Sequence, residues 1–186
     1  MKPGQSSRGF TLLETLVVAL LIGIVALAAV PLLSSQNPTK LDVAAAEVGN
    51  ALRFAISEVE RIGGCVWVDG SVSGHLRVYS SAACAISGWG VVSDPLTKRA
   101  LDVSTSGPAF SGLVSMTPRF MQGGTAYTQL MIVGPGGVGP GTGTLHVFQG
   151  GTYRGPLEAG SGVVLTLGPQ TAAVAFNEIT GRVTLP

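Results

Sequence analysis

The sequence predicts an α+β protein in which a long N-terminal helix packs on a small antiparallel β-domain. Three observations predict it: an uncharged apolar run near the N-terminus, a following stretch in which apolar residues recur at steps of three and four, and, after residue 64, short alternating segments separated by Gly, Pro, Ser and Asp. The first half of the helix is expected to span a membrane and the second half to be amphipathic.

The membrane-spanning half follows from composition. Of 186 residues, 46% are apolar and 11% charged, which is more apolar than a soluble domain usually is. Much of the excess lies in Leu16–Leu33, where eighteen consecutive residues carry no charged or polar side chain. With residues 11–15 added, the run approaches the roughly 20 residues that cross a bilayer core. The chain therefore has room for one domain and an anchor.

Basic residues around this run predict its orientation. Lys2 and Arg8 precede the run, and the next basic residue, Lys40, lies well beyond it. This asymmetry favours a cytoplasmic N-terminus and an exported C-terminus. Cys65 and Cys84 would then lie in an oxidising compartment, where they either form a disulfide or remain two buried thiols.

The residues before the apolar run do not have the order of an ordinary secretory signal, whose cleavage site follows its apolar stretch. Here residues 1–9 are short and polar, and the small residue Gly9 precedes the run. Cleavage after Gly9 on the cytoplasmic side would remove a leader and leave the anchor on a mature chain that begins at Phe10. The alternative is a plain signal anchor that is not cut, in which Gly9 has no function.

Glu14 is the second unusual feature of this segment. A carboxylate in an apolar helix costs about 2.5–3.5 kcal/mol at the membrane centre and less near the surface. The amine freed at Phe10 would lie about one helical turn away, in the same chain or in a neighbouring one. Between neighbouring chains, this charge-assisted contact would set the register of helices that pack side by side.

The sequence Gly9-Phe10-Thr11-Leu12-Leu13-Glu14, followed by an apolar helix, resembles the type III signal of type IV pilins and type II secretion pseudopilins. The resemblance implies that a prepilin peptidase cuts after Gly9 and methylates Phe10, and that Glu14 guides docking into a growing filament. Pro31 falls where pilin helices commonly kink or melt, because proline removes a helical hydrogen bond and crowds the preceding turn.

The remaining chain divides into a second helix and a β-domain. The implied boundaries are a leader at 1–9, a transmembrane and filament-core helix at 10–33, an amphipathic periplasmic helix at 34–63 and a periplasmic β-domain at 64–186. The apolar stripe of the amphipathic helix runs from Lys40 to Ile62, and Gly63-Gly64 ends it. Strands are expected at 65–68, 75–79, 89–92, 129–133, 144–148, 163–167 and 172–176.

Three local features narrow the resemblance to the H-type minor pseudopilins (GspH) and the FimT/FimU-like minor pilins. The helix segment Ala51–Ile56 runs into a strand, Ser87–Asp94 resembles their Gly-Trp strand ending in Asp, and Phe176–Arg182 resembles their C-terminal hairpin. The order of these three features along the chain further supports this narrower resemblance.

No catalytic, cofactor or metal motif emerges from the sequence. His75 and His146 lie in alternating strands, where structural histidines are common, and no nucleophile motif surrounds any serine. Cys65 and Cys84 lack the paired spacing of a zinc site. The glycine-rich stretch 134–143 has no following lysine and is expected to be a flexible hairpin loop. The sequence therefore predicts that the protein is not an enzyme.

Charge argues against nucleic acid as a partner. The formal net charge is +1, and after Arg119 only Arg154 and Arg182 remain, so no basic stripe is available for phosphates. Some FimT-like pilins bind DNA through a Gly-Arg-x-Arg motif, whereas this chain has Gly181-Arg182-Val183-Thr184.

Together these observations favour a minor pseudopilin of a type II secretion system, a structural subunit at or near the tip of a periplasmic pseudopilus. Its implied partners are the prepilin peptidase, other major and minor pilins or pseudopilins, the inner-membrane assembly platform and, before assembly, membrane lipid. The implied location is the bacterial inner membrane, in a single pass, and then the filament. The alternatives are a minor pilin that primes a type IV pilus, with DNA uptake a less favoured function, or an anchored periplasmic enzyme or binding protein.

Overall fold

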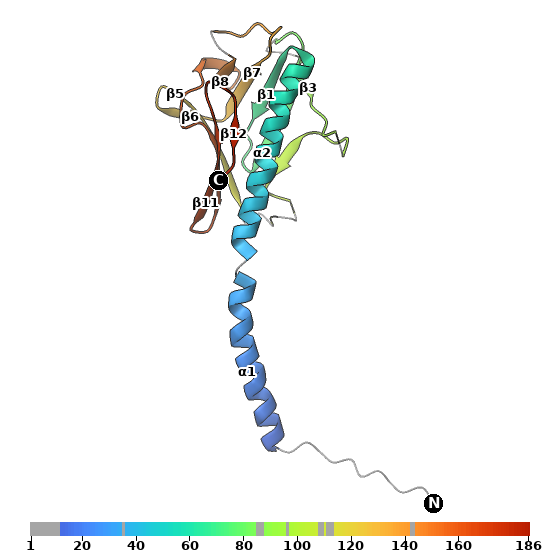
Figure 1. The fold of residues 1–186 in the computed structure, drawn as a ribbon, viewed down its shortest axis with the longest axis vertical. Coiled ribbons are helices and arrows are strands. Elements are labelled where there is room, and N and C mark those ends of the chain that lie inside the picture. Colours follow the sequence, from blue (N-terminus) through green and yellow to red (C-terminus); the bar gives the residue numbers. More distant parts are fainter. Residues whose placement is uncertain are drawn as a thin grey trace, which may run out of the picture. The chain divides into compact units, whose positions relative to one another are not determined.

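The computed structural model describes residues 12–34, 36–84, 88–95, 97–107, 110, 114–141 and 144–186 (Figure 1). The chain divides into two compact units, Met1–Asn37 and Pro38–Pro186, which are described in turn. The structure is α+β, as predicted: helices come first, and antiparallel strands follow.

The first unit contains helix α1, Leu12–Ser34. Its 23 residues extend for about 34 Å at the usual rise of an α-helix. Glu14 lies in its first turn, and no basic residue lies in its last. Within the described part of the chain, no helix combines the length and hydropathy that crossing a membrane requires.

Helix α2, Gln36–Ile62, lies within the amphipathic segment predicted at 34–63 and begins four residues before the predicted apolar stripe, which starts at Lys40. Pro38 is its third residue, in the first turn, where a missing backbone N–H costs no helical hydrogen bond. The glycine end of the helix is confirmed. Gly63 adopts a left-handed φ of 65° and donates its N–H to the carbonyl of Val59 at 3.0 Å.

The strands form two antiparallel sheets. One sheet has the order β3-β2-β1-β7-β8-β9, with β4 also pairing with β2, and the other has the order β12-β11-β10-β5-β6. The bounds in the first sheet are β1 Cys65–Asp69, β2 His75–Ser81, β3 Gly90–Val91, β4 Asp102–Ser104, β7 Gln129–Val133, β8 Leu145–Gln149 and β9 Thr152–Pro156. Those in the second are β5 Ser115–Gln122, β6 Thr125–Tyr127, β10 Gly162–Leu167, β11 Gln170–Phe176 and β12 Val183–Thr184.

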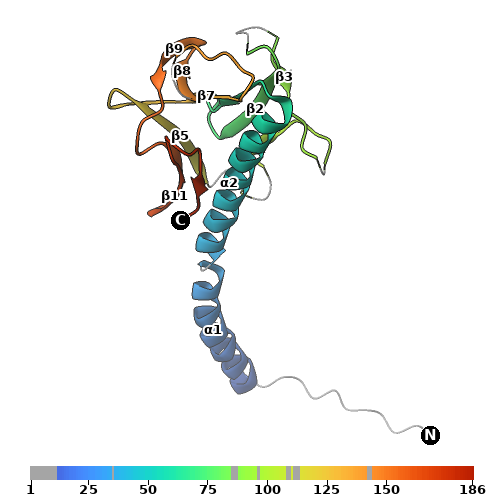
Figure 2. The same ribbon diagram turned by 45° about the horizontal axis from the view of Figure 1, so that its top comes forward.

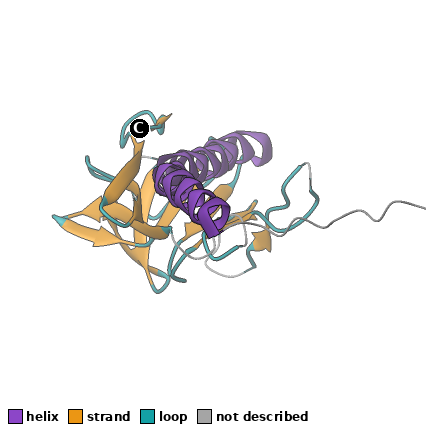
Figure 3. Cartoon of the chain, turned by 90° about the horizontal axis from the view of Figure 1, so that it is seen from below, coloured by secondary structure: helices purple, strands orange, loops and turns teal. Residues whose placement is uncertain are grey.

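One hydrophobic core joins α2 to the inner faces of both sheets. In Figure 2, α2 runs beside β2, and Figure 3 shows the strands gathered on one side of the helix. The stripe of α2 supplies Leu41, Ala44, Ala45, Val48, Leu52, Ala55 and Val59, all buried. The predicted amphipathic stripe is thus confirmed, because these positions recur at helical spacing and lie in the core.

Each of the seven predicted strands overlaps an observed strand, but the segment at 89–92 is a strand only at Gly90–Val91. Five strands were missed: β4, β5, β6, β9 and β12. The β5 sequence contains Pro118 between polar residues, and β9 contains Gly155 and Pro156. Proline and glycine usually mark edges or bulges, which conceals a strand in the sequence. The pairing of the edge strand β9 with β8 does carry a register shift, between Val147 and Phe148 of β8.

Candidate assembly site

The described side chains of α1 present large apolar groups to solvent in the isolated chain. Leu12 is 83% exposed and Leu13 74%, and the same is true farther along the helix for Leu16, Val17, Val18, Leu20, Leu21, Ile22, Ile24 and Val25. These side chains do not gather on one stripe but surround the helix. A helix that is apolar on all sides is stable when lipid or other helices cover it. The described part of α1 therefore has the apolar surface of a helix that lipid or other helices cover.

Glu14 is the only charged residue between Leu12 and Ser34. It lies in the first turn of α1, where the free backbone N–H groups give the helix end a partial positive charge. A carboxylate at this position stabilises a helix by about 0.3–1 kcal/mol. The following residue, Thr15, donates its hydroxyl to the carbonyl of Leu12 at 2.8 Å. The carboxylate thus begins an apolar surface that contains no other charge.

The two predicted processing residues, Gly9 and Phe10, lie outside the described residues, as does any contact between Glu14 and a Phe10 amine. Cleavage and charge pairing therefore stay predictions. Pro31 lies within α1, three residues before its end, and the expected kink also stays a prediction.

Cys65 and Cys84 are joined by a disulfide with a Cα–Cα distance of 5.0 Å. Cys65 is the first residue of β1 and is buried, whereas Cys84 follows β2 and is partly exposed. The sequence left a bridge and two thiols as alternatives, and the structure contains the bridge. It ties the start of β1 to the segment that leads toward β3.

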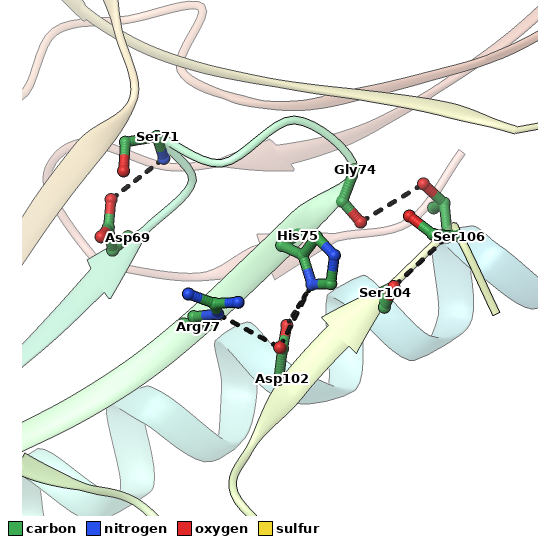
Figure 4. Close-up of polar contacts among 9 residues, drawn as sticks. Asp69, Ser71, Gly74, His75, Arg77, Asp102, Ser104 and Ser106 are labelled. Atoms are coloured by element: carbon green, nitrogen blue, oxygen red, sulfur yellow. Dashed lines mark hydrogen bonds and ion pairs between the residues drawn. The ribbon is translucent and has the colours of Figure 1, made fainter. Parts of the chain in front are cut away.

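His75 is held by an acidic partner on a neighbouring strand. Its Nδ1 lies 3.0 Å and 3.1 Å from the two carboxylate oxygens of Asp102, and Arg77 Nε donates to the same carboxylate at 3.2 Å (Figure 4). The hydrogen bond and the charge of Asp102 raise the pKa of Arg77. His75 pairs with Ser104, and Arg77 with Asp102, across strands β2 and β4. The cluster fastens the short strand β4 to the sheet, which agrees with a structural histidine.

His146 occupies a different environment. It is fully buried in β8, and its ring meets that of Tyr153 edge to face at 5.6 Å. Among the described residues, no group of three or more His, Cys, Asp or Glu side chains is arranged to hold a metal ion.

The comparison with protein families finds the prokaryotic N-terminal methylation motif at residues 4–30. The matched range contains Gly9, Phe10 and Glu14 and extends through most of α1. No curated protein and no solved structure matches the chain. The motif is typical of structural subunits that are membrane-anchored before they enter a filament. The chain thus carries the N-terminal methylation motif of type IV pilin-like proteins, the group to which pilins and pseudopilins belong.

Proposed function

We propose that this protein is a minor pseudopilin of a type II secretion system, incorporated at or near the tip of a short periplasmic filament that drives protein export. One observation carries the proposal: the methylation motif at residues 4–30 coincides with a helix that is apolar on all sides and bears a single carboxylate in its first turn. The exposed apolar side chains of such a helix need to be covered by other helices. The methylation motif indicates that these helices belong to other type IV pilin-like subunits.

Before assembly, the apolar run holds the subunit in the inner membrane, with lipid covering its side chains. The charge asymmetry of Lys2 and Arg8 against the uncharged run favours a leader in the cytoplasm and a β-domain in the periplasm. The Cys65–Cys84 disulfide is compatible with this location, because disulfides persist in oxidising compartments. The prepilin peptidase then cuts after Gly9 and methylates the amine of Phe10.

During assembly, Glu14 meets the Phe10 amine of the adjacent subunit. A charge pair is strongest where water is absent, so the contact forms when helices pack together and fixes their axial register. The surrounding leucine and valine side chains then bury against equivalent helices. This chain's part in the mechanism is assembly, and the assembly platform and its ATPase supply the work.

The β-domain faces outward from the filament and meets other minor subunits or cargo. The apolar stripe of α2 is already occupied by the core of its own domain. Contacts with partners must therefore use other surfaces: the outer faces of the sheets, the loops and the exposed face of α2. The three local features at Ala51–Ile56, Ser87–Asp94 and Phe176–Arg182 favour the H-type subunit within this class.

A minor pilin that primes a type IV pilus is the close alternative, since it would use the same signal and the same helix. An anchored periplasmic enzyme or binding protein is the alternative of another class. It predicts an uncut N-terminus and no co-purification with filament components.

Deletion of the gene, with secreted protein and twitching motility scored in parallel, distinguishes these functions. We expect secretion to fall and motility to be retained, and wild-type complementation to restore secretion. Loss of motility with intact secretion would support the type IV pilus alternative instead. If neither changes, the protein is not a required subunit of either machine.

A further inference from the structure

The two cysteines of the Cys65–Cys84 disulfide occupy unequal positions in the β-domain. Cys65 is the first residue of β1, a strand that pairs with β2 on one side and with β7 on the other. Its exposed fraction is 0%. Cys84 lies between β2 and β3, outside the described strands, and is partly exposed. The bridge therefore joins a fully buried residue to a partly exposed one.

Cys65 belongs to a small apolar cluster beside the main core. The buried members of this cluster are Cys65, Met131, Val133 and Phe148, and the partly buried side chains packed against them are Trp67, Cys84, Trp89 and Tyr153. Met131 and Val133 come from β7 and Phe148 from β8, so the cluster forms when these strands join β1. Once it has formed, a reagent in solvent cannot reach the Cys65 thiol unless the sheet opens.

The glycine-rich loop that follows β7 closes against the same region. Gly134 donates its N–H at 2.7 Å to the carbonyl of Gly64, the residue before Cys65. A Cβ on Gly137 would lie 2.7 Å from Cys84 Sγ, so glycine allows the loop backbone to approach the disulfide. This role differs from the flexibility expected from the sequence.

The backbone at Cys84 adopts a conformation that the local chain does not favour. Its φ is 53°, in the left-handed region that residues other than glycine seldom occupy. The closed disulfide holds the residue there. In the reduced chain the Cys84 thiol therefore has more freedom to move than the Cys65 thiol, which β1 fixes within the sheet.

Folding is faster than disulfide formation. A β-hairpin forms in about 1–10 μs and a β-rich domain folds in about milliseconds to seconds, whereas disulfides form over about seconds to hours. The hairpin of β1 and β2 places Cys65 opposite Ser81, which is close to Cys84 in the chain. The sheet thus buries Cys65 before an oxidant reacts with it, and Cys84 remains the accessible thiol.

We propose that Cys84 is the entry point for the disulfide: it accepts a mixed disulfide from an oxidant, and Cys65 then resolves this intermediate. The Cys84 thiolate attacks one sulfur of the oxidant's disulfide and releases the other sulfur as a thiol. The Cys65 thiolate then attacks Cys84 Sγ and releases the first sulfur as a second thiol. Two electrons and two protons pass from the cysteines to the oxidant.

The oxidant is a disulfide of the exported compartment, carried by a protein or by a small molecule. The inference rests on the exported location in the proposed function, and it does not depend on the kind of filament. Thiol exchange requires access to the sulfur, so the order of the two steps follows from the unequal burial of the cysteines.

Oxidised glutathione tests the order in the purified protein. Full-length protein in detergent is reduced, freed of reductant, mixed with oxidised glutathione and quenched with acid at short intervals, and modified peptides are mapped by mass spectrometry. We expect glutathione on Cys84 to exceed that on Cys65 by about tenfold or more, because exchange depends on access. In denaturant both thiols are exposed, and the preference should disappear.

Equal or greater modification of Cys65 in the folded protein would overturn the proposal, as would a preference for Cys84 that persists in denaturant. This experiment requires neither export nor a filament, so its failure is distinct from a failure of the proposed function.

Two matched single-cysteine variants test the order in cells and distinguish the two kinds of oxidant. Cys65→Ala keeps the entry thiol without the resolving thiol, whereas Cys84→Ala keeps only the buried one. After free thiols are blocked, we expect Cys65→Ala to carry severalfold more reductant-sensitive adduct than Cys84→Ala. A mass increase of protein size indicates a protein oxidant, and a small increase indicates a low-molecular-weight disulfide. Equal adducts on both variants, more on Cys84→Ala, or none on either contradict the assigned order.

Discussion

Replacement of Glu14 with alanine is expected to reduce incorporation of the subunit into its filament by about tenfold to 150-fold. This range corresponds to the 1.5–3 kcal/mol that a hydrogen bond to a charged group contributes. Glu14 is the only charge on the apolar surface of α1, so no neighbouring residue can replace it. The measurement is the fraction of subunit recovered in sheared or cross-linked filaments relative to the membrane fraction.

Membrane insertion serves as the internal control for this variant. Removal of a carboxylate lowers the free-energy cost of inserting the segment into lipid. The amount of subunit recovered in the membrane should therefore not fall. Leu13→Ala, at an exposed neighbouring position, removes apolar area without a charge and should reduce incorporation much less. Glu14→Gln keeps the shape without the charge and should resemble Glu14→Ala. Normal incorporation of the alanine variant would remove the electrostatic explanation of docking.

Leu52→Ala is expected to destabilise the β-domain by about 2–5 kcal/mol, because it leaves a cavity in a packed interior. Leu52 is fully buried in the stripe of α2, within the core that this helix shares with both sheets. For a domain of this size the melting temperature should fall by about 4–20 °C. Thermal unfolding of the full-length protein in detergent, followed by circular dichroism, measures the change.

Ser57→Ala is the matched control on the same helix. Its side chain is exposed, and its hydroxyl donates only to the carbonyl of Phe54 at 2.9 Å. We expect a change of less than about 0.5 kcal/mol, as for most surface substitutions. Equal melting temperatures for the Leu52 and Ser57 variants would mean that α2 does not complete the core.

The helices could be predicted because their signals are local. The buried stripe of α2 recurs at steps of three and four, and Gly63 ends the helix as expected. The helix extends four residues before the apolar stripe begins at Lys40, because Pro38 lies in its first turn, where proline is tolerated. A single sequence does not show which turn of the helix a proline occupies.

The sheets were less predictable, because pairing is non-local. β1 and β10 are mostly apolar segments bounded by turn-forming residues, and both were predicted from the sequence. β5 alternates buried and exposed residues but carries Pro118, so its pattern resembled a loop. Its partners β10 and β6 follow it in the chain at different distances, and no local rule selects them.

The candidate sites differ in the same way. Glu14 could be identified from sequence because a carboxylate beside a long apolar run is chemically unusual. The aromatic cluster of Trp67, Trp89 and Tyr153 could not, because these residues come together only after three separate segments have folded. The only signal in the sequence was an aromatic residue at a strand position opposite the core, as at Trp67.

Mass spectrometry of the mature N-terminus tests the central claim most directly. The protein is purified from cells that contain the prepilin peptidase, and its N-terminal peptide is sequenced. We predict a chain that begins with N-methylated Phe10, with residues 1–9 removed. A mature chain that still begins at Met1 in those cells would contradict the account, because the amine assigned to pair with Glu14 would not exist.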